Sequence, residues 1–396
     1  MSYRVLLITY KTPIPIKDGG AFAINNIIKG YLEKNYKVDL FIISTNKHHA
    51  NIEEIEKYYK SKVYIQNINS NKALLNNLVK KIPLILKRFY SKKIEEIIKN
   101  IIINEKYDFI QFEGLQTTTY INTIKKNSNA KIIYRPHNIE HRIWERISKN
   151  QKFILFKILY KIISLQLKKY EKKIINKYDI IIPITEIDAN FFKINGNNKP
   201  LHVYPFGIDI VENFSPCNNN DLFFIGALDW KPNIEGLIWF ITNVWQDIKR
   251  QFPDIKFYIA GRNPSKKTKR IINKLEANFI GEVEDSGKFI KEHKIMIVPL
   301  FAGSGIRVKI IEAMAYGKII ITTPIGIEGI PAQHMTNIII AEKKEDFIFY
   351  INKILNDVNL ANTISKNAYE FIKIHYNNKI LMNKLNDFYN TCIKII

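Results

Sequence analysis

Short β-branched runs recur along the whole chain, and each is followed by a segment of helix length. This alternation is typical of βαβ units, which build a parallel sheet with helices on its faces. The runs fall into two series, which predicts two open sheets. The first series is Val5–Thr9, Val38–Ser44, Val63–Ile68, Phe109–Phe112, Ile132–Arg135 and Ile180–Ile184. The second is Leu222–Gly226, Phe257–Ala260, Asn278–Ile280, Ile295–Leu300, Ile319–Thr322 and Ile338–Ala341.

The length of the chain agrees with two sheets. Its 396 residues are too many for one ordinary core and suit two domains of roughly 150 to 200 residues. Segment 200–220 lies between the two series and is rich in turn residues, among them Pro200, Pro205 and Pro216. We therefore predict doubly wound α/β domains over 1–200 and 201–375, followed by a C-terminal segment, 376–396.

The composition favours a soluble cytoplasmic protein. Hydrophobic residues make up 46% and charged residues 24% of the chain, close to the globular average. Cys217 and Cys392 match no metal spacing or disulfide framework, which fits a reducing compartment. The segment Met1–Tyr10 runs directly into the first strand without the pattern of a signal peptide. Lysines interrupt every long apolar segment, so none approaches the ~18 residues of a membrane span.

The positive charge is concentrated in the first half. The net charge of +23 divides into +19 for residues 1–200, from 36 basic and 17 acidic residues, and +4 for residues 201–396, from 24 and 20. Such asymmetry points to an anionic partner, either lipid headgroups, a phosphorylated acceptor or nucleic acid. The alternative is a lysine-rich proteome in which the charge has no specific partner.

Two stretches of the first half combine apolar and basic residues. Segment 149–177 has helical period, with an apolar stripe and lysines on another side. The stripe consists of Phe153, Phe156, Leu159, Ile163 and Leu167, and the lysines are Lys157, Lys161, Lys168 and Lys172. Segment Leu78–Tyr90 has a similar mixture. Each is either a core helix with solvated lysines or a peripheral attachment to an anionic membrane surface, which the charge asymmetry slightly favours.

The most informative loop follows the predicted strand Ile295–Leu300. In open parallel sheets, ligands bind beyond the carboxyl ends of the strands. Here a glycine-bearing loop leads into a helix that we expect to begin near Gly305 and to end at Gly317. Arg307 and Lys309 lie in its first turn, where a cation opposes the helix dipole, so a bound diphosphate explains them better than helix stability does. Glu312 follows, and its carboxylate suits the two hydroxyl groups of a ribose.

This region resembles a known family. The stretch Gly303–Gly317 with Thr323–Ile330 is similar to the donor-binding region of GT-B glycosyltransferases of family four, also called group 1. Further matches in the expected order are Phe224–Gly236, Ile259–Arg262 and Phe279–Asp285. The resemblance implies two Rossmann-like domains facing across a cleft, and a C-terminal helix that packs back on the N-terminal domain. It also implies sugar transfer from a nucleotide sugar with retention at the anomeric carbon and without an active-site metal.

The resemblance also assigns roles to residues of the second half. It implies that Arg307 and Lys309 hold the diphosphate, Glu312 the ribose, and the loop Glu282–Asp285 the base. The full set of implied donor contacts in this half is Gly226, Arg262, Val283, Glu284, Gly303, Ser304, Gly305, Ile306 and Glu312. Ser304 stands where the family has a glutamate that reads the sugar hydroxyls, so the N–H groups of Gly303–Gly305 would substitute in part.

Candidate residues also follow three strands of the first half. Gly19 and Gly20 open a helix after the first strand, and similar glycines of the family face the donor phosphates, although such a sequence also makes a plain turn. Tyr134–Arg142 places several ionisable side chains past one strand, and the family has a catalytic-site histidine there, here His137. We predict acceptor contacts by Glu113, Arg135, Asn138 and Glu140, with a purely structural Glu113 as an equal alternative.

The predicted reaction needs no cofactor other than a nucleotide-sugar co-substrate, most simply a UDP- or GDP-sugar. Cations at the leaving diphosphate would supply the main stabilisation, and no Asp-x-Asp metal signature occurs. The resemblance implies front-face attack, in which the departing phosphate takes the acceptor proton. The acceptor would be a glycan or a lipid-linked glycan of surface polysaccharide assembly. The alternatives are a nucleotide-sugar epimerase on the same fold and a nucleic-acid-binding protein, for which no recognised module is present.

Overall fold

The computed structural model describes residues 2–16, 18–45, 51–69, 71–72, 82–151, 153–210, 219–303 and 305–394. The chain divides into two compact units. The first comprises Met1–Gly207 together with Asn378–Ile396, and the second is Ile208–Asn377. The border at Gly207 lies inside the turn-rich segment 200–220. No helix of the described chain is long and apolar enough to cross a membrane.

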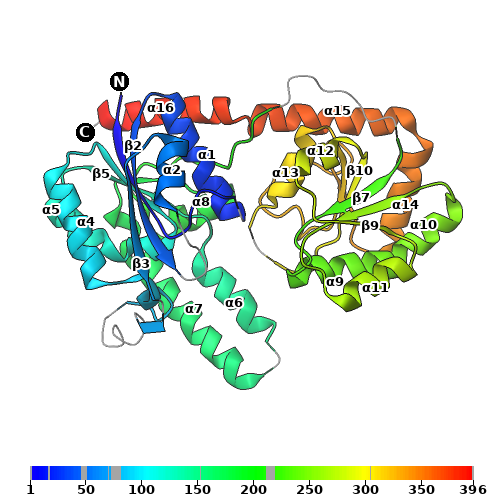
Figure 1. Cartoon of the computed structure of the whole chain (residues 1–396), viewed down its shortest axis with the longest axis horizontal. Coiled ribbons are helices and arrows are strands. Elements are labelled where there is room, and N and C mark those ends of the chain that lie inside the picture. The colour runs from blue at the N-terminus through cyan, green and yellow to red at the C-terminus, as the bar shows by residue number, and fades with distance from the viewer. Residues whose placement is uncertain are drawn as a thin grey trace. The chain divides into compact units, whose positions relative to one another are not determined.

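The first unit is a six-stranded parallel sheet in the order β3-β2-β1-β4-β5-β6 (Figure 1). Its strands are β1 (Arg4–Thr9), β2 (Lys37–Thr45), β3 (Val63–Ile68), β4 (Phe109–Glu113), β5 (Lys131–Arg135) and β6 (Ile180–Ile181). Its helices are α1 (Gly19–Glu33), α2 (Ile52–Tyr59), η1 (Leu86–Phe89), α4 (Lys92–Asn104), η2 (Leu115–Tyr120), α5 (Ile121–Asn127), α6 (Glu140–Lys149), α7 (Ile154–Ile174), η3 (Ile175–Lys177), α8 (Glu186–Ile194) and α16 (Asn378–Lys394). Strand β6 ends earlier than predicted, two residues before Pro183, which cannot donate to a ladder.

Both faces of this sheet are buried, which explains why its strands are continuous apolar runs. Successive residues of a strand point to opposite faces. Leu6 and Ile8 of β1 pack in one core with α4, α5 and α7, whereas Val5 and Leu7 pack in the other with α1 and α2.

Helix α16 completes the second of these cores, which confirms the predicted return of the C-terminal helix to the N-terminal domain. Its buried side chains include Met382, Leu385 and Tyr389. The helix approaches α1 so closely that a Cβ atom on Gly30 would lie 2.8 Å from the Met382 sulfur. Glycine at this position therefore allows the two helices to touch.

The second unit repeats the architecture with the sheet order β12-β11-β10-β7-β8-β9, again all parallel. Its strands are β7 (Leu222–Ile225), β8 (Phe257–Ala260), β9 (Asn278–Gly281), β10 (Ile295–Val298), β11 (Ile319–Thr322) and β12 (Ile339–Ile340). Its helices are α9 (Lys231–Phe240), η4 (Ile241–Trp245), α10 (Gln246–Gln251), α11 (Lys266–Lys274), α12 (Ser286–Lys291), α13 (Val308–Ala315), α14 (Lys344–Asn356) and α15 (Val358–His375). Each predicted strand is thus present, with shifted ends.

Three helical segments differ in detail from the prediction. Helix α13 begins at Val308 and not near Gly305, because Gly305 has a φ of +82°, outside the helical region. Segment 149–177 is helical from Ile154, and Ile163 and Leu167 of its predicted stripe are buried, whereas Phe153, Phe156 and Leu159 are exposed. Residues 78–81 of the other basic stretch lie outside the described residues. The rest of that stretch packs against the first core through Ile82, Ile85 and Leu86, so it offers no unpartnered apolar face.

Candidate functional site

The order of the first sheet fixes where a ligand can bind in this unit. Strands β1 and β4 are neighbours although they are not consecutive, so the connections leave them in opposite directions. A crevice forms at such a switch point, beyond the carboxyl ends of the strands. Glu113 ends β4, Arg135 ends β5, and His137 follows it. The predicted residues of these strand ends therefore gather at one edge of the sheet.

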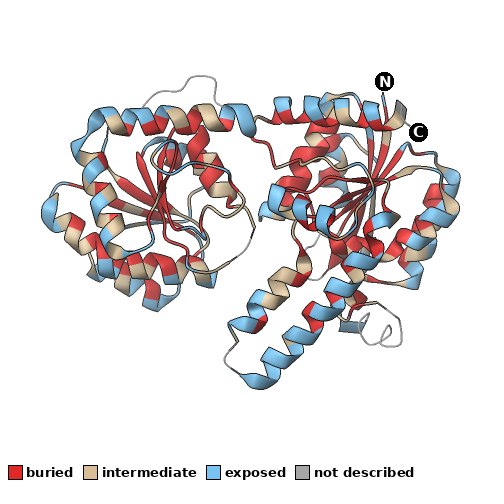
Figure 2. Cartoon of the chain, turned by 180° about the vertical axis from the view of Figure 1, so that it is seen from behind, coloured by how far each residue is buried: buried red, intermediate tan, exposed pale blue. Residues whose placement is uncertain are grey.

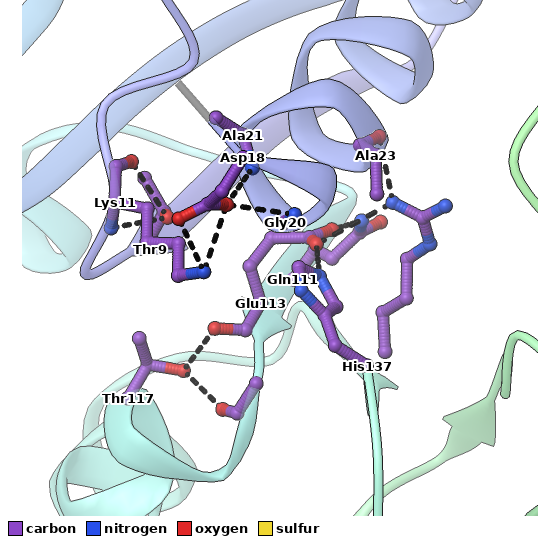
Figure 3. Close-up of polar contacts among 12 residues, drawn as sticks. Thr9, Lys11, Asp18, Gly20, Ala21, Ala23, Gln111, Glu113, Thr117 and His137 are labelled. Carbon is purple, nitrogen blue, oxygen red and sulfur yellow. Dashed lines mark hydrogen bonds and ion pairs between the residues drawn. The ribbon is translucent and has the colours of Figure 1, made fainter. Parts of the chain in front are cut away.

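Glu113 is the centre of a buried polar cluster at this edge (Figure 3). One of its carboxylate oxygens accepts a hydrogen bond from Gln111 Nε2 at 2.5 Å, and the other lies 2.5 Å from His137 Nε2. Arg135 Nη1 lies 3.5 Å from the same carboxylate and donates to the carbonyl oxygen of Ala23 in α1 at 3.0 Å. The cluster thus ties the ends of β4 and β5 to helix α1.

These contacts fix the protonation of His137. Burial alone would raise the pKa of Glu113, but Arg135 and the hydrogen bond from His137 outweigh burial. The net effect is a lowered pKa, so the carboxyl is ionised. Burial, Arg135 and Lys11 lower the pKa of His137 against the opposing effect of Glu113, so the imidazole is neutral. A carboxylate only accepts hydrogen bonds, so His137 carries its proton on Nε2 and donates it to Glu113. Its Nδ1 is then the acceptor of the ring.

Burial changes the interpretation of two predicted acceptor contacts. The side chains of Glu113 and Arg135 have an exposed fraction of 0%, whereas His137 retains 10%. We therefore place Glu113 and Arg135 behind His137, where they orient the ring, and not at the surface that an acceptor would touch. The Glu113 carboxylate and the Arg135 guanidinium are both buried, and a buried charge requires a partner of opposite charge, so the two side chains stabilise each other behind the ring.

The sequence analysis missed a hydrogen-bonded chain that reaches this cluster from the C-terminus. The hydroxyl groups of Tyr389 and Tyr31 lie 2.8 Å apart, and the Tyr31 hydroxyl donates to Gln111 Oε1 at 2.5 Å. Gln111 then donates to Glu113. Helix α16 is thereby connected to His137 through polar contacts. No local motif signals this, because Tyr31 and Tyr389 are 358 positions apart.

The glycines that open α1 are already engaged by an acidic cap. Asp18 Oδ1 accepts hydrogen bonds from the N–H groups of Gly20 at 2.8 Å and Ala21 at 3.0 Å. The ammonium of Lys11 lies 2.9 Å from the same carboxylate. A Cβ atom on Gly20 would lie 2.6 Å from this ammonium. A phosphate that approached Gly19 and Gly20 would therefore meet Asp18 first, with Lys11 as the nearby cation. Lys11 was not predicted.

Glu140 and Asn138, the remaining acceptor candidates, lie at the start of α6. Glu140 Oε1 accepts a hydrogen bond from Gln116 Nε2 at 3.1 Å. Burial raises the pKa of Glu140 to about 7, and the neighbouring carboxylate of Glu171 contributes in the same direction. Glu140 can therefore exchange a proton near neutral pH. Asn138 is half-buried between His137 and this helix.

The second sheet has its own switch point, between β7 and β10. The loop after β10 contains Gly303 with a φ of +124° and Gly305 with a φ of +82°, both in the left-handed region that favours glycine. A Cβ atom on Gly303 would lie 2.8 Å from Arg307 Nη2, and Arg307 Nη1 donates to the carbonyl oxygen of Gly305 at 2.6 Å. The loop therefore wraps the buried guanidinium of Arg307. Ser304, predicted as a donor contact, lies outside the described residues, and Ile306 is half-buried.

Lys309 projects from α13 to the loop after β7. Its ammonium donates to the carbonyl oxygen of Ile225 at 3.1 Å and to Asn233 Oδ1 at 3.2 Å. A Cβ atom on Gly226 would lie 3.1 Å from this ammonium. Burial, and then the charge of Arg307, lower the pKa of Lys309 to about 7. The structure thus brings Gly226, Arg307 and Lys309 together at the switch point. An anion bound there would favour the charged form of Lys309.

The other predicted donor contacts belong to several elements of the second unit. Glu312 Oε1 accepts a hydrogen bond from Ser286 Oγ at 3.0 Å, and burial raises the pKa of this glutamate. Val283 and Glu284 are in the loop between β9 and α12, half-buried and exposed respectively, and the exposed Arg262 follows β8. Arg262, Val283 and Glu284 follow carboxyl ends of strands, whereas Glu312 lies within α13. Among the described residues, no group of three His, Cys, Asp or Glu side chains is arranged to hold a metal.

Comparison with known proteins finds a family match in the second unit. Residues 219–357 match the family model described as glycosyl transferases group 1. The matched residues lie in the second unit, and they include the loop after β10 and all of α13. The expected likeness to glycosyl transferases group 1 is confirmed over these residues.

Relatives extend over the whole chain. A protein of Klebsiella pneumoniae, called an uncharacterized 44.6 kDa protein in the cps region, is 25% identical over 392 residues, 95% of this chain and 97% of that protein. Among solved structures, HepE of Anabaena in complex with UDP has a TM-score of 0.68 at 14% identity, covering 98% of this chain and 100% of HepE. Sucrose-phosphate synthase of Thermosynechococcus elongatus has a TM-score of 0.71 at 14% identity, covering both chains fully. The chain has the GT-B fold.

Proposed function

We propose that the protein transfers a sugar from a nucleotide-sugar donor to a glycan or lipid-linked acceptor, with retention at the anomeric carbon and without a required metal or other cofactor. The observation that carries this proposal is the pair of basic side chains at the switch point of the second unit, the buried Arg307 and the half-buried Lys309. Breaking the bond between the anomeric carbon and the phosphate leaves negative charge on the diphosphate. Arg307 and the protonated form of Lys309 would stabilise that charge from fixed positions, without reorganisation.

His137 takes a second role in this proposal. As a neutral ring with its proton held on Nε2 by Glu113, it presents Nδ1 as an acceptor for a hydroxyl of the donor sugar or of the acceptor. Glu113 and Arg135 act as positioning residues that keep the tautomer and the ring orientation. Glu312 binds the ribose, and Val283 and Glu284 lie near the base.

The biological setting that we propose is surface polysaccharide assembly in the cytoplasm. It is supported by the Klebsiella pneumoniae relative, whose description places it in the cps region. A UDP-sugar is the first donor to test, since HepE has been crystallised with UDP and with UDP-glucose. A GDP-sugar is the second.

A thermal-shift series with UDP-, GDP-, ADP- and TDP-sugars tests the donor, because a ligand that binds only the folded state raises the melting temperature. We expect one base to give the largest shift, and the Arg307→Ala variant to lose it. Turnover of that donor is then measured with and without a glycan acceptor. Conversion of the donor sugar into an isomer without any acceptor would instead indicate an epimerase and contradict the proposal.

A further inference from the structure

Helices α6 and α7 form a hairpin, residues 140–174, that extends away from the sheet of the first unit (Figure 1). Apolar side chains of α7 lie on its outer turns with exposed fractions of 41% to 77%. We call the following set the outer face: Ile154, Leu155, Ile158, Leu159, Ile162 and Leu165. Their spacings of three, four, seven and eleven residues return to one side of a helix. Ile147, Phe153 and Phe156 of the same hairpin are exposed as well, and the remaining exposed large apolar residues of the described chain are scattered over other elements.

The hairpin holds this face in place. The opposite side of α7 is buried through Ile163 and Leu167. The base of the hairpin is tied by Glu171, whose carboxylate lies 2.5 Å from His141 Nδ1 and accepts a hydrogen bond from the Glu140 N–H at 2.9 Å. Near the tip, Ser148 Oγ donates to the carbonyl oxygen of Lys157 at 2.8 Å. The exposed apolar face is therefore preformed, and its exposure is not a result of fraying.

The positive charge of the hairpin favours a negatively charged partner. Residues 140–174 contain ten basic and three acidic residues, a difference of +7. Of the acids, Glu171 is buried against His141, and Glu145 pairs with Lys149 and Lys161. Much of the hairpin is exposed, as Figure 2 shows in pale blue. The lysines that flank the outer face are all exposed: Lys157, Lys161, Lys168, Lys169 and Lys172.

We propose that the outer face of the α6–α7 hairpin binds the surface of an anionic lipid bilayer. Aliphatic side chains flanked by lysines match the boundary between acyl chains and negative headgroups, as in interfacial amphipathic helices. A second copy of this chain is a poorer partner, because its own hairpin would bring the same positive charge into the contact. The hairpin starts at Glu140, three residues after His137, so it leaves the sheet at the edge that carries the candidate site.

Vesicle flotation with the full chain tests this inference. Vesicles of phosphatidylcholine alone are compared with vesicles that contain an equal amount of phosphatidylglycerol. We expect recovery with the anionic vesicles only, falling as salt rises. The double variant Leu155→Ser/Leu159→Ser should bind at least about tenfold more weakly, because both side chains would leave the acyl boundary. The double variant Lys168→Gln/Lys172→Gln should lose about fivefold per lysine.

A matched control is the double variant Phe349→Ser/Val358→Ser, which removes two comparably exposed apolar side chains of the second unit. It should float like the unaltered protein. Equal recovery with both kinds of vesicle, or equal binding by the outer-face variant and this control, would overturn the proposal. So would a dimer in solution that Leu155→Ser/Leu159→Ser converts to a monomer without any vesicle binding.

The readouts also separate this inference from the proposed function. Affinity for UDP, measured without vesicles, should be unchanged in the outer-face variant, which also shows that it is folded. If the unaltered protein fails to bind or turn over any nucleotide sugar but still floats, the enzymatic proposal fails and the bilayer site stands.

Discussion

Raising the pH from 7 to 9 should weaken the binding of UDP by up to about 50-fold through one lysine. Lys309 has a pKa of about 7 in the structure, lowered by burial and by Arg307. A bound diphosphate favours the charged ammonium, so binding raises the pKa of Lys309. Above pH 7 most of the free protein has a neutral Lys309, which must therefore take up a proton when UDP binds. Affinity is then fully developed below pH 7 and is lost as the pH rises.

The size of the effect follows from the half-protonated state at pH 7. Each pH unit well above the pKa costs a factor of ten, so two units cost a factor of 100, halved because Lys309 is already half deprotonated at the start. The result corresponds to about 2.3 kcal/mol. An ordinary lysine, with a pKa near 10.4, would give almost no change over this range.

Isothermal titration calorimetry with UDP at constant ionic strength measures this directly. The Lys309→Met variant, which keeps the chain length without the charge, is the control and should bind weakly with a nearly flat pH dependence. Proton uptake should appear as a dependence of the heat on the buffer used. A pH-independent affinity of the unaltered protein, or the same slope in Lys309→Met, would refute the reasoning.

Further predictions concern the two sites separately. Glu113→Gln should lower the stability by about 3 to 5 kcal/mol in urea unfolding, because Arg135 would remain buried without its counter-charge; an unchanged midpoint would contradict the buried pair. Gly303→Ala should weaken UDP binding and lower the melting temperature, whereas Gly196→Ala, also at positive φ but with open space around it, should cost only about 1 kcal/mol of backbone strain and leave UDP binding intact. Tyr389→Phe should change the pH profile of turnover more than the affinity for UDP, if its hydroxyl chain positions His137; identical profiles would remove that link. Treatment with a chelator should leave the turnover rate unchanged, and a loss that Mg²⁺ restores would show a required metal.

The strands and their order along the chain were predictable, because a strand that is buried on both faces of its sheet consists of a continuous run of apolar residues. The candidate cations of the second unit were identifiable from the sequence by another signal. Arg307 and Lys309 oppose the dipole of α13, so helix stability gives no reason for them. The start of α13 was not predictable from periodicity, since it depends on the positive φ of Gly305.

The environment of His137 could not be predicted from its neighbours in the sequence. Its partner Glu113 comes from the adjacent strand, and the second contact of Arg135 is a backbone carbonyl of α1. The chain through Tyr31 and Tyr389 exists only because α16 packs on α1. Contacts between distant segments depend on packing, which a single sequence does not display. Whether Leu159 is buried or exposed was left open for the same reason, because periodicity places a residue on a stripe without saying what covers it.

The most direct test of the account is the turnover number of the double variant Arg307→Ala/Lys309→Ala with the nucleotide sugar that gives the largest thermal shift. Loss of one such stabilising group often lowers the rate by ~10²–10³, and the account predicts at least that loss together with weaker donor binding. Circular dichroism and the vesicle-binding assay show whether the variant is folded. A folded variant with undiminished turnover and donor affinity would contradict the claim that these two cations carry the reaction.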